Sequence, residues 1–89
     1  MTMIGGTTMR DSVKRDLQAI FREIFDDKSI EIFDEMTADD IEEWDSLMHI
    51  QLLLAIEKKF NVAFKTEDVM EIQNVGQFID YLIKKIGAR

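Results

Sequence analysis

The chain has 89 residues, of which 46% are hydrophobic and 33% are charged, with a net charge of −7 and no cysteine. This length fits one domain, whose single small core leaves no room for a buried multi-residue catalytic cleft. The acidity argues against nucleic acid or an anionic membrane surface as a partner, and the missing cysteine excludes disulfides and a thiolate nucleophile.

Residues 1–8 contain neither the basic nor the apolar segment of a signal peptide, so we expect a flexible leader before one domain at residues 9–87. The longest apolar run, Leu52 to Ile56, is far too short to span a bilayer, and no membrane insertion is expected. A domain this small without disulfide bonds is typical of the reducing cytoplasm.

Apolar residues at helical spacing predict a first helix that begins after Thr8, its expected N-cap. Its apolar stripe consists of Val13, Leu17, Ile20, Phe21, Ile24 and Phe25. A long connection follows, at about residues 26–45, and its apolar residues indicate a segment packed over the core. These residues are Ile30, Ile32, Phe33, Met36 and Ile41. No partner strand for a short strand at residues 30–32 is evident.

A helix predicted at roughly residues 46–60, with Asp45 or Ser46 as its cap, carries two neighbouring apolar stripes. One stripe consists of Leu52, Leu53, Ile56 and Phe60, and the other of Leu47, Ile50 and Leu54. An apolar surface this broad is either deeply buried or binds a partner, and periodicity alone does not separate the two.

Two more helices complete a predicted all-α fold of four helices. The short third helix is expected from about residue 66 to residue 72, with Thr66 as its cap. The last is expected from residue 75 to residue 86, where Asn74 and Gln77 have capping-box spacing and Gly87 lies just past the end.

The negative charge is concentrated in one part of the chain. The net charge is +1 over residues 1–25, −8 over residues 26–60 and 0 over residues 61–89. This acidity is either a solvated loop or a surface that steers basic partners. The segment from Asp26 lacks the ligand spacing and central glycine of an EF-hand, so no metal site is predicted.

Few residues are suited to catalysis, and no enzymatic activity is predicted. Ser46 and His49, the only histidine, have i, i+3 spacing on one helix, but no nucleophile-elbow motif supports a hydrolase. Ser46 is more informative as the residue that opens the broadly apolar helix. An anionic group attached to its hydroxyl would lie against free backbone N–H groups at the positive end of the helix dipole.

The segment Glu43-Trp44-Asp45-Ser46-Leu47, with the apolar pattern that follows it, resembles the signature of acyl carrier proteins around Asp-Ser-Leu. The resemblance covers about residues 9–87 and implies a four-helix bundle of acyl-carrier type, with a long first connection and a short third helix. It also implies that a phosphopantetheinyl transferase attaches 4′-phosphopantetheine from coenzyme A to Ser46, with Asp45 and Leu47 as the flanking motif.

The resemblance further implies which residues meet partners and cargo. The partner-facing set would be Glu42, Glu43, Leu47, Ile50, Leu54 and Glu57, recognised by basic docking surfaces on acyl-loading and acyl-transferring enzymes. The core and acyl-chain lining would be Leu52, Leu53, Ile56 and Phe60. The cofactor thiol would carry acyl intermediates of fatty-acid, polyketide or related lipid biosynthesis as thioesters, on a carrier expected to be monomeric.

Trp44 before Asp-Ser-Leu and His49 after it are more similar to discrete carriers of specialised pathways than to carriers of fatty-acid elongation. Two alternatives remain open at this stage. One is an aminoacyl carrier, of D-alanyl or peptidyl type. The other is a helical interaction module without a cofactor, whose broad apolar face binds a partner helix.

Overall fold

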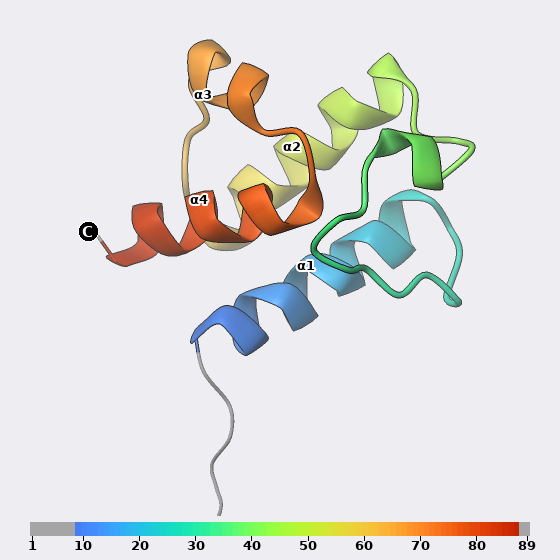
Figure 1. The fold of residues 1–89 in the computed structure, drawn as a ribbon, viewed down its shortest axis with the longest axis horizontal. Coiled ribbons are helices and arrows are strands. Elements are labelled where there is room, and N and C mark those ends of the chain that lie inside the picture. Colours follow the sequence, from blue (N-terminus) through green and yellow to red (C-terminus); the bar gives the residue numbers. More distant parts are fainter. Residues whose placement is uncertain (1–8, 88–89) are drawn as a thin grey trace, which may run out of the picture.

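The computed structural model describes residues 9–87, which form an all-α fold, as predicted (Figure 1). Its elements are α1 (Met9–Ile24), the 3-10 helix η2 (Ala38–Asp40), α2 (Ser46–Phe60), α3 (Thr66–Glu71) and α4 (Val75–Gly87). Helix α1 packs against both α2 and α4, while α3 is a short helix on the side away from α1. No helix in this part of the chain is long and apolar enough to cross a membrane.

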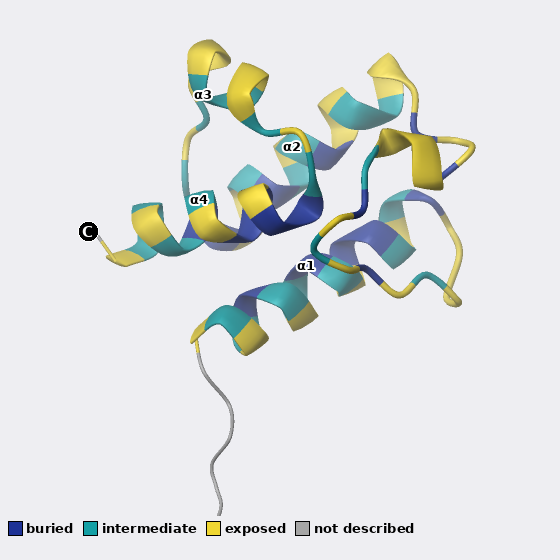
Figure 2. Cartoon of the chain, in the orientation of Figure 1, coloured by how far each residue is buried: buried dark blue, intermediate teal, exposed yellow. Residues whose placement is uncertain are grey.

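The core lies where the apolar stripes of α1, α2 and α4 meet, and Figure 2 shows these faces as the buried ones. The core residues that are completely shielded from solvent are Leu17, Phe21, Leu52, Ile56, Val75, Ile79 and Leu82. They follow the 3.6-residue period of each helix, which is why the sequence pattern predicted these three helices correctly.

The long connection between α1 and α2 is held down by its backbone. The carbonyl oxygens of Met36 and Asp34 accept the N–H groups of Val75 and Gly76 at 2.9 and 2.8 Å. These carbonyls satisfy amides at the start of α4, which have no partner within their own helix. A Cβ at Gly76 would lie 3.1 Å from the Asp34 oxygen, so glycine permits this close approach.

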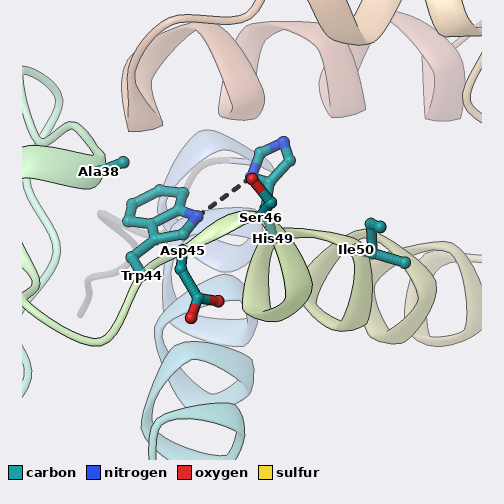
Figure 3. Close-up of a pocket in the computed structure, with 6 residues that line it drawn as sticks. All are labelled: Ala38, Trp44, Asp45, Ser46, His49 and Ile50. Carbon is teal, nitrogen blue, oxygen red and sulfur yellow. Dashed lines mark hydrogen bonds between the residues drawn. The ribbon is translucent and has the colours of Figure 1, made fainter.

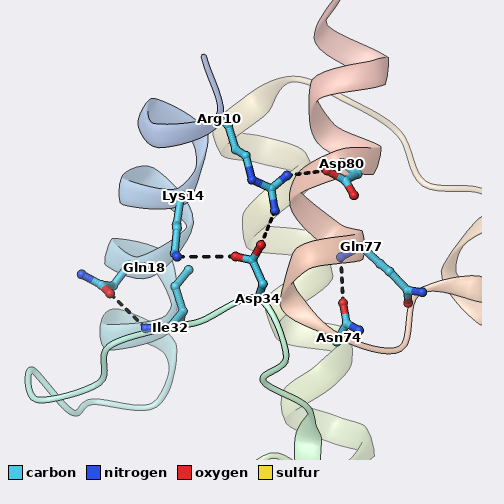
Figure 4. Close-up of polar contacts among 8 residues, drawn as sticks. All are labelled: Arg10, Lys14, Gln18, Ile32, Asp34, Asn74, Gln77 and Asp80. Carbon is cyan, nitrogen blue, oxygen red and sulfur yellow. Dashed lines mark hydrogen bonds and ion pairs between the residues drawn. The ribbon is translucent and has the colours of Figure 1, made fainter. Parts of the chain in front are cut away.

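Side chains of α1 reinforce the same connection (Figure 4). The Gln18 side-chain oxygen accepts the Ile32 N–H at 3.0 Å. Arg10 donates to Asp34 at 2.6 Å and also to Asp80 of α4, and this pairing lowers the pKa of the Asp34 carboxyl. The pairs are partly exposed to water, so they orient the connection more than they stabilise it.

The apolar residues of the connection divide between core and surface. Ile32, Met36 and Ile41 are buried, as expected for a segment packed over the core. Ile30 is only half-buried, and Phe33 is 42% exposed, so the expectation that they also pack inward was wrong for Phe33. The 3-10 helix η2, which the sequence analysis did not predict, is held by a capping box between Thr37 and Asp40.

Several helix ends differ from the predictions. Thr66 is the first residue of α3 rather than its cap, and Lys65 at the cap position makes no side-chain hydrogen bond. Asn74 does accept the Gln77 N–H at 2.8 Å, but Gln77 reaches back to Gln73 instead of completing a box with Asn74.

Two further predictions concern the C-terminal ends of α1 and α4. Gly87 is the last residue of α4 rather than the first beyond it, and Phe25 follows the end of α1. Thr8 lies outside the described residues.

Candidate functional site

The first turn of α2 presents an exposed serine at a helix N-terminus. Asp45 is the N-cap, and its side chain accepts the Met48 N–H at 2.9 Å. Ser46 follows as the first helical residue, with an exposed side chain. Among residues 9–87, no acceptor meets the N–H groups of Ser46 and Leu47. An anion beside Ser46 would therefore meet free amides and the positive end of the α2 dipole.

Beside this serine, Trp44 and His49 form a hydrogen-bonded pair (Figure 3). The indole Nε1–H of Trp44 donates to Nδ1 of His49 at 3.0 Å, and the two rings are stacked with centroids 6.0 Å apart. Trp44 is buried against Phe21 of α1 and Phe25 just after that helix, which anchor it to the core. Half-burial of His49 lowers the pKa of its imidazole, so the ring is neutral at pH 7.

The same residues line an open hollow of about 470 Å³ around Ser46. Its walls are Ala38, Trp44, Asp45, Ser46, His49 and Ile50 (Figure 3). No hydrogen bond joins Ser46 to His49 within the described chain, and the His49 Nδ1 is already occupied by Trp44. The spacing that suggested a Ser–His pair therefore does not produce a nucleophile and its base.

A second hollow, of about 380 Å³, runs between α2 and α3. It is lined by His49, Ile50, Leu53, Leu54, Glu57, Phe64, Thr66, Val69 and Met70. Helix α3 has no buried residue, so it covers this groove only loosely. The Tyr81 hydroxyl donates to Asp68 at 2.9 Å and ties α3 to α4; burial and this contact raise the pKa of Tyr81 to about 12.

The two apolar stripes predicted on α2 are separated as expected, with one exception. Leu47, Ile50 and Leu54 are 63%, 55% and 61% exposed, whereas Leu52, Ile56 and Phe60 are buried. Leu53, which was predicted to lie in the core, is only half-buried. It lines the α2–α3 groove, because α3 is too short and too loosely packed to enclose it.

The acidic residues gather before α2 rather than along it. Glu42 and Glu43, which precede Ser46 by four and three residues, are exposed, as are Asp39 and Asp40 of η2. Glu57, the acidic residue predicted within α2, is half-buried and accepts the Phe64 N–H at 2.9 Å, so it also supports the fold. Within residues 9–87, no three acidic or histidine side chains are grouped as a metal site would need.

Comparison with known proteins agrees with this arrangement. A family model described as a phosphopantetheine attachment site matches residues 15–82. The fold is similar to the solution structure of holo acyl carrier protein from Geobacter metallireducens, with a TM-score of 0.82 and 36% sequence identity. That likeness covers 85% of this chain and 87% of the other. The chain belongs to the acyl carrier protein family.

Two curated acyl carrier proteins are similar over shorter stretches. One, from Cyanidium caldarium, is 36% identical over 45 residues, and one from Chlorobium phaeobacteroides is 42% identical over 41 residues. The matches cover 51% and 46% of this chain. They also cover only about half of the two relatives, 52% of the first protein's length and 53% of the second's.

Membership of the acyl carrier protein family agrees with the small number of residues suited to catalysis in this chain. Domains of this family carry covalently attached 4′-phosphopantetheine, and they are carriers rather than enzymes. In such domains the reactive sulfur belongs to the cofactor, so the absence of cysteine from this chain is compatible with membership of the family.

Sequence reasoning did not assign a role to Trp44, nor did it find the Trp44–His49 hydrogen bond. Residues five apart that face each other across the start of a helix leave no periodic pattern. The available signal was the presence of a single tryptophan beside the proposed attachment motif. The groove residues Phe64, just before α3, and Val69 and Met70 within it were missed because this short segment has no clear apolar stripe.

Proposed function

We propose that Ser46 is the attachment residue for 4′-phosphopantetheine, with Asp45 and Leu47 shaping the turn around it. The observation that carries this proposal is the exposed hydroxyl of Ser46 on the first residue of α2, at the edge of an open hollow. A transferase can reach such a hydroxyl without unfolding any of the core.

The residues around Ser46 suit a phosphodiester. The N–H groups of Ser46 and Leu47 are unpaired within residues 9–87 and lie at the positive helix end, where an anion is stabilised. The neighbouring Asp45 carboxylate already accepts the Met48 amide, which offsets part of its repulsion of a second anion. The open walls of the hollow leave room for an arm to extend away from the serine.

The function that this site supports best is that of an acyl carrier. When attached, the cofactor supplies a thiol on which acyl groups are carried as thioesters. We assign the cargo to fatty-acid, polyketide or related lipid biosynthesis, in a discrete carrier that acts as a monomer in the cytoplasm. Trp44 and His49 line the site, and their sequence resemblance to discrete carriers favours a specialised pathway rather than fatty-acid elongation.

Partner enzymes would dock on the exposed stripe of α2 and the acids before it. Leu47, Ile50 and Leu54 are apolar and mostly exposed, which suits the centre of an interface. Glu42 and Glu43 are exposed shortly before that stripe in the chain and would steer basic surfaces of a phosphopantetheinyl transferase and of acyl-handling enzymes. Glu57 contributes less to docking, because its carboxylate is held by the Phe64 amide.

The assignment of Ser46 is tested by incubating the purified chain with coenzyme A and a phosphopantetheinyl transferase. Intact mass spectrometry should show a gain of one phosphopantetheine, which Ser46→Ala abolishes. Ser29→Ala is the matched control, because Ser29 is also exposed and the variant should be modified fully. Modification of Ser46→Ala at the parent's level refutes the assignment.

A further inference from the structure

His49 lies where the hollow around Ser46 meets the groove between α2 and α3. It lines the hollow around Ser46 together with Trp44, and it also lines the groove between α2 and α3. Among residues 9–87, Ile50 is the other residue that lines both. A flexible group attached at Ser46 that extends toward the groove therefore passes the imidazole of His49.

Trp44 determines which nitrogen of that imidazole carries the proton. An indole N–H can only donate, so the His49 Nδ1 that it contacts at 3.0 Å must act as the acceptor. The ring is consequently neutral with its proton on Nε2, and burial, which disfavours the charged form, keeps it so. The indole is itself fixed by packing against Phe21 and Phe25.

The resulting Nε2–H donor has no acceptor among residues 9–87. In Figure 3 this second ring nitrogen points away from Trp44, on the opposite side of the ring from the hydrogen bond. The ring is only half-buried, so this N–H is open to a group that enters the site, where a carbonyl oxygen could accept it. Amide carbonyl oxygens recur along a phosphopantetheine arm, which gives the donor a chemically matched acceptor.

We propose that Trp44 and His49 are positioning residues for the arm. Trp44 holds the Nε2–H tautomer of His49, and this N–H donates to a carbonyl oxygen of the arm where the Ser46 hollow meets the α2–α3 groove. The arm is thereby directed toward the groove. This inference rests on the proposed attachment at Ser46.

Nitrogen-15 NMR of the imidazole tests the pair directly, because His49 is the only histidine and Trp44 the only tryptophan. The unmodified protein should show one neutral tautomer, with Nδ1 unprotonated and Nε2 protonated. After modification, the Nε2–H signal should shift downfield, and its exchange with water should slow at least about five-fold, as expected for a new hydrogen bond.

Mass spectrometry of the same samples separates the outcomes. If the mass rises by one phosphopantetheine and the imidazole signals do not change, the positioning role is refuted while attachment stands. If no mass is gained, both are refuted. An unmodified protein with its proton on Nδ1 overturns the pairing itself.

Variants separate donation from simple ring packing. His49→Phe keeps a ring beside Trp44 but removes the donor, so the free thiol of the modified protein should react about two- to five-fold faster with an aromatic disulfide reagent. His49→Gln retains an amide N–H donor and should stay closer to the parent rate. Equal rates for the two variants would contradict a donor role. Trp44→Phe should give mixed tautomers, and each variant's fold is checked by circular dichroism.

Discussion

Two leucines of α2, two residues apart, provide a matched test of how the helix divides its surface. Leu52 is completely buried against the core, whereas Leu54 is 61% exposed on the proposed docking stripe. Leu52→Ala and Leu54→Ala remove the same atoms from the same helix and leave the same residue behind. Any difference in stability therefore reports burial rather than helix propensity.

The structure sets the size of the difference. Truncation of a fully buried leucine costs about 2–5 kcal/mol, because it leaves a cavity as well as losing apolar contact. A domain of this size is stable by roughly 4–12 kcal/mol in total, so Leu52→Ala should remove a large fraction. Leu54 has little contact to lose, and its truncation should cost about 1 kcal/mol or less.

Urea unfolding followed by circular dichroism measures both variants. Leu52→Ala should lower the unfolding midpoint strongly with an unchanged slope, and Leu54→Ala should remain near the parent. The modification rate should show the reverse order: Leu54→Ala slows transfer from coenzyme A, whereas folded Leu52→Ala does not. Equal destabilisation by the two substitutions would refute the division of α2 into a core face and a docking face.

Three other predictions follow from the charged and titratable groups. Burial lowers the pKa of His49 in the folded protein, so below about pH 6.5 the unfolded chain binds a proton more readily and the free energy of unfolding falls as the pH falls. His49→Gln should flatten the dependence of the unfolding free energy on pH in this range, and an unchanged dependence would contradict the prediction. Added salt should slow modification by the transferase several-fold, because it screens charges beyond about 8–10 Å. The double variant Glu42→Gln, Glu43→Gln should depend less on salt, and a salt-independent rate for the parent would refute electrostatic steering. Tyr81→Phe removes the hydrogen bond to Asp68, so it should lower the free energy of unfolding by about 1 kcal/mol and speed amide hydrogen exchange in α3. Unchanged exchange would show that this hydrogen bond does not hold α3.

The helices with regular apolar stripes were predictable because burial imposes a 3.6-residue period on them. Val13 and Leu17 in α1, and Phe78 and Leu82 in α4, are buried as their spacing requires. The short α3 was placed almost correctly, but its cap was not. The helix begins at Thr66 itself with Lys65 at the cap position, a difference of one residue that sequence patterns do not resolve.

Some features of the site could be predicted from the sequence, and others could not. The position of Ser46 at the start of an amphipathic helix follows from local sequence. The half-burial of Leu53 does not, since it depends on how much of α2 is covered by α3. The Trp44–His49 hydrogen bond depends on the packing of Trp44 against Phe21 of α1, more than twenty residues earlier in the chain. Sequence patterns around residue 44 do not reveal such a long-range contact.

The central claim is that this chain carries acyl groups on an arm at Ser46. Intact and tandem mass spectrometry of the protein purified from its native host tests that claim most directly, because it reports the arm, the cargo and the modified residue together. We predict a phosphopantetheine on Ser46, with an acyl group on its thiol in part of the sample. A population that is entirely unmodified, or modified at a residue other than Ser46, would contradict the account.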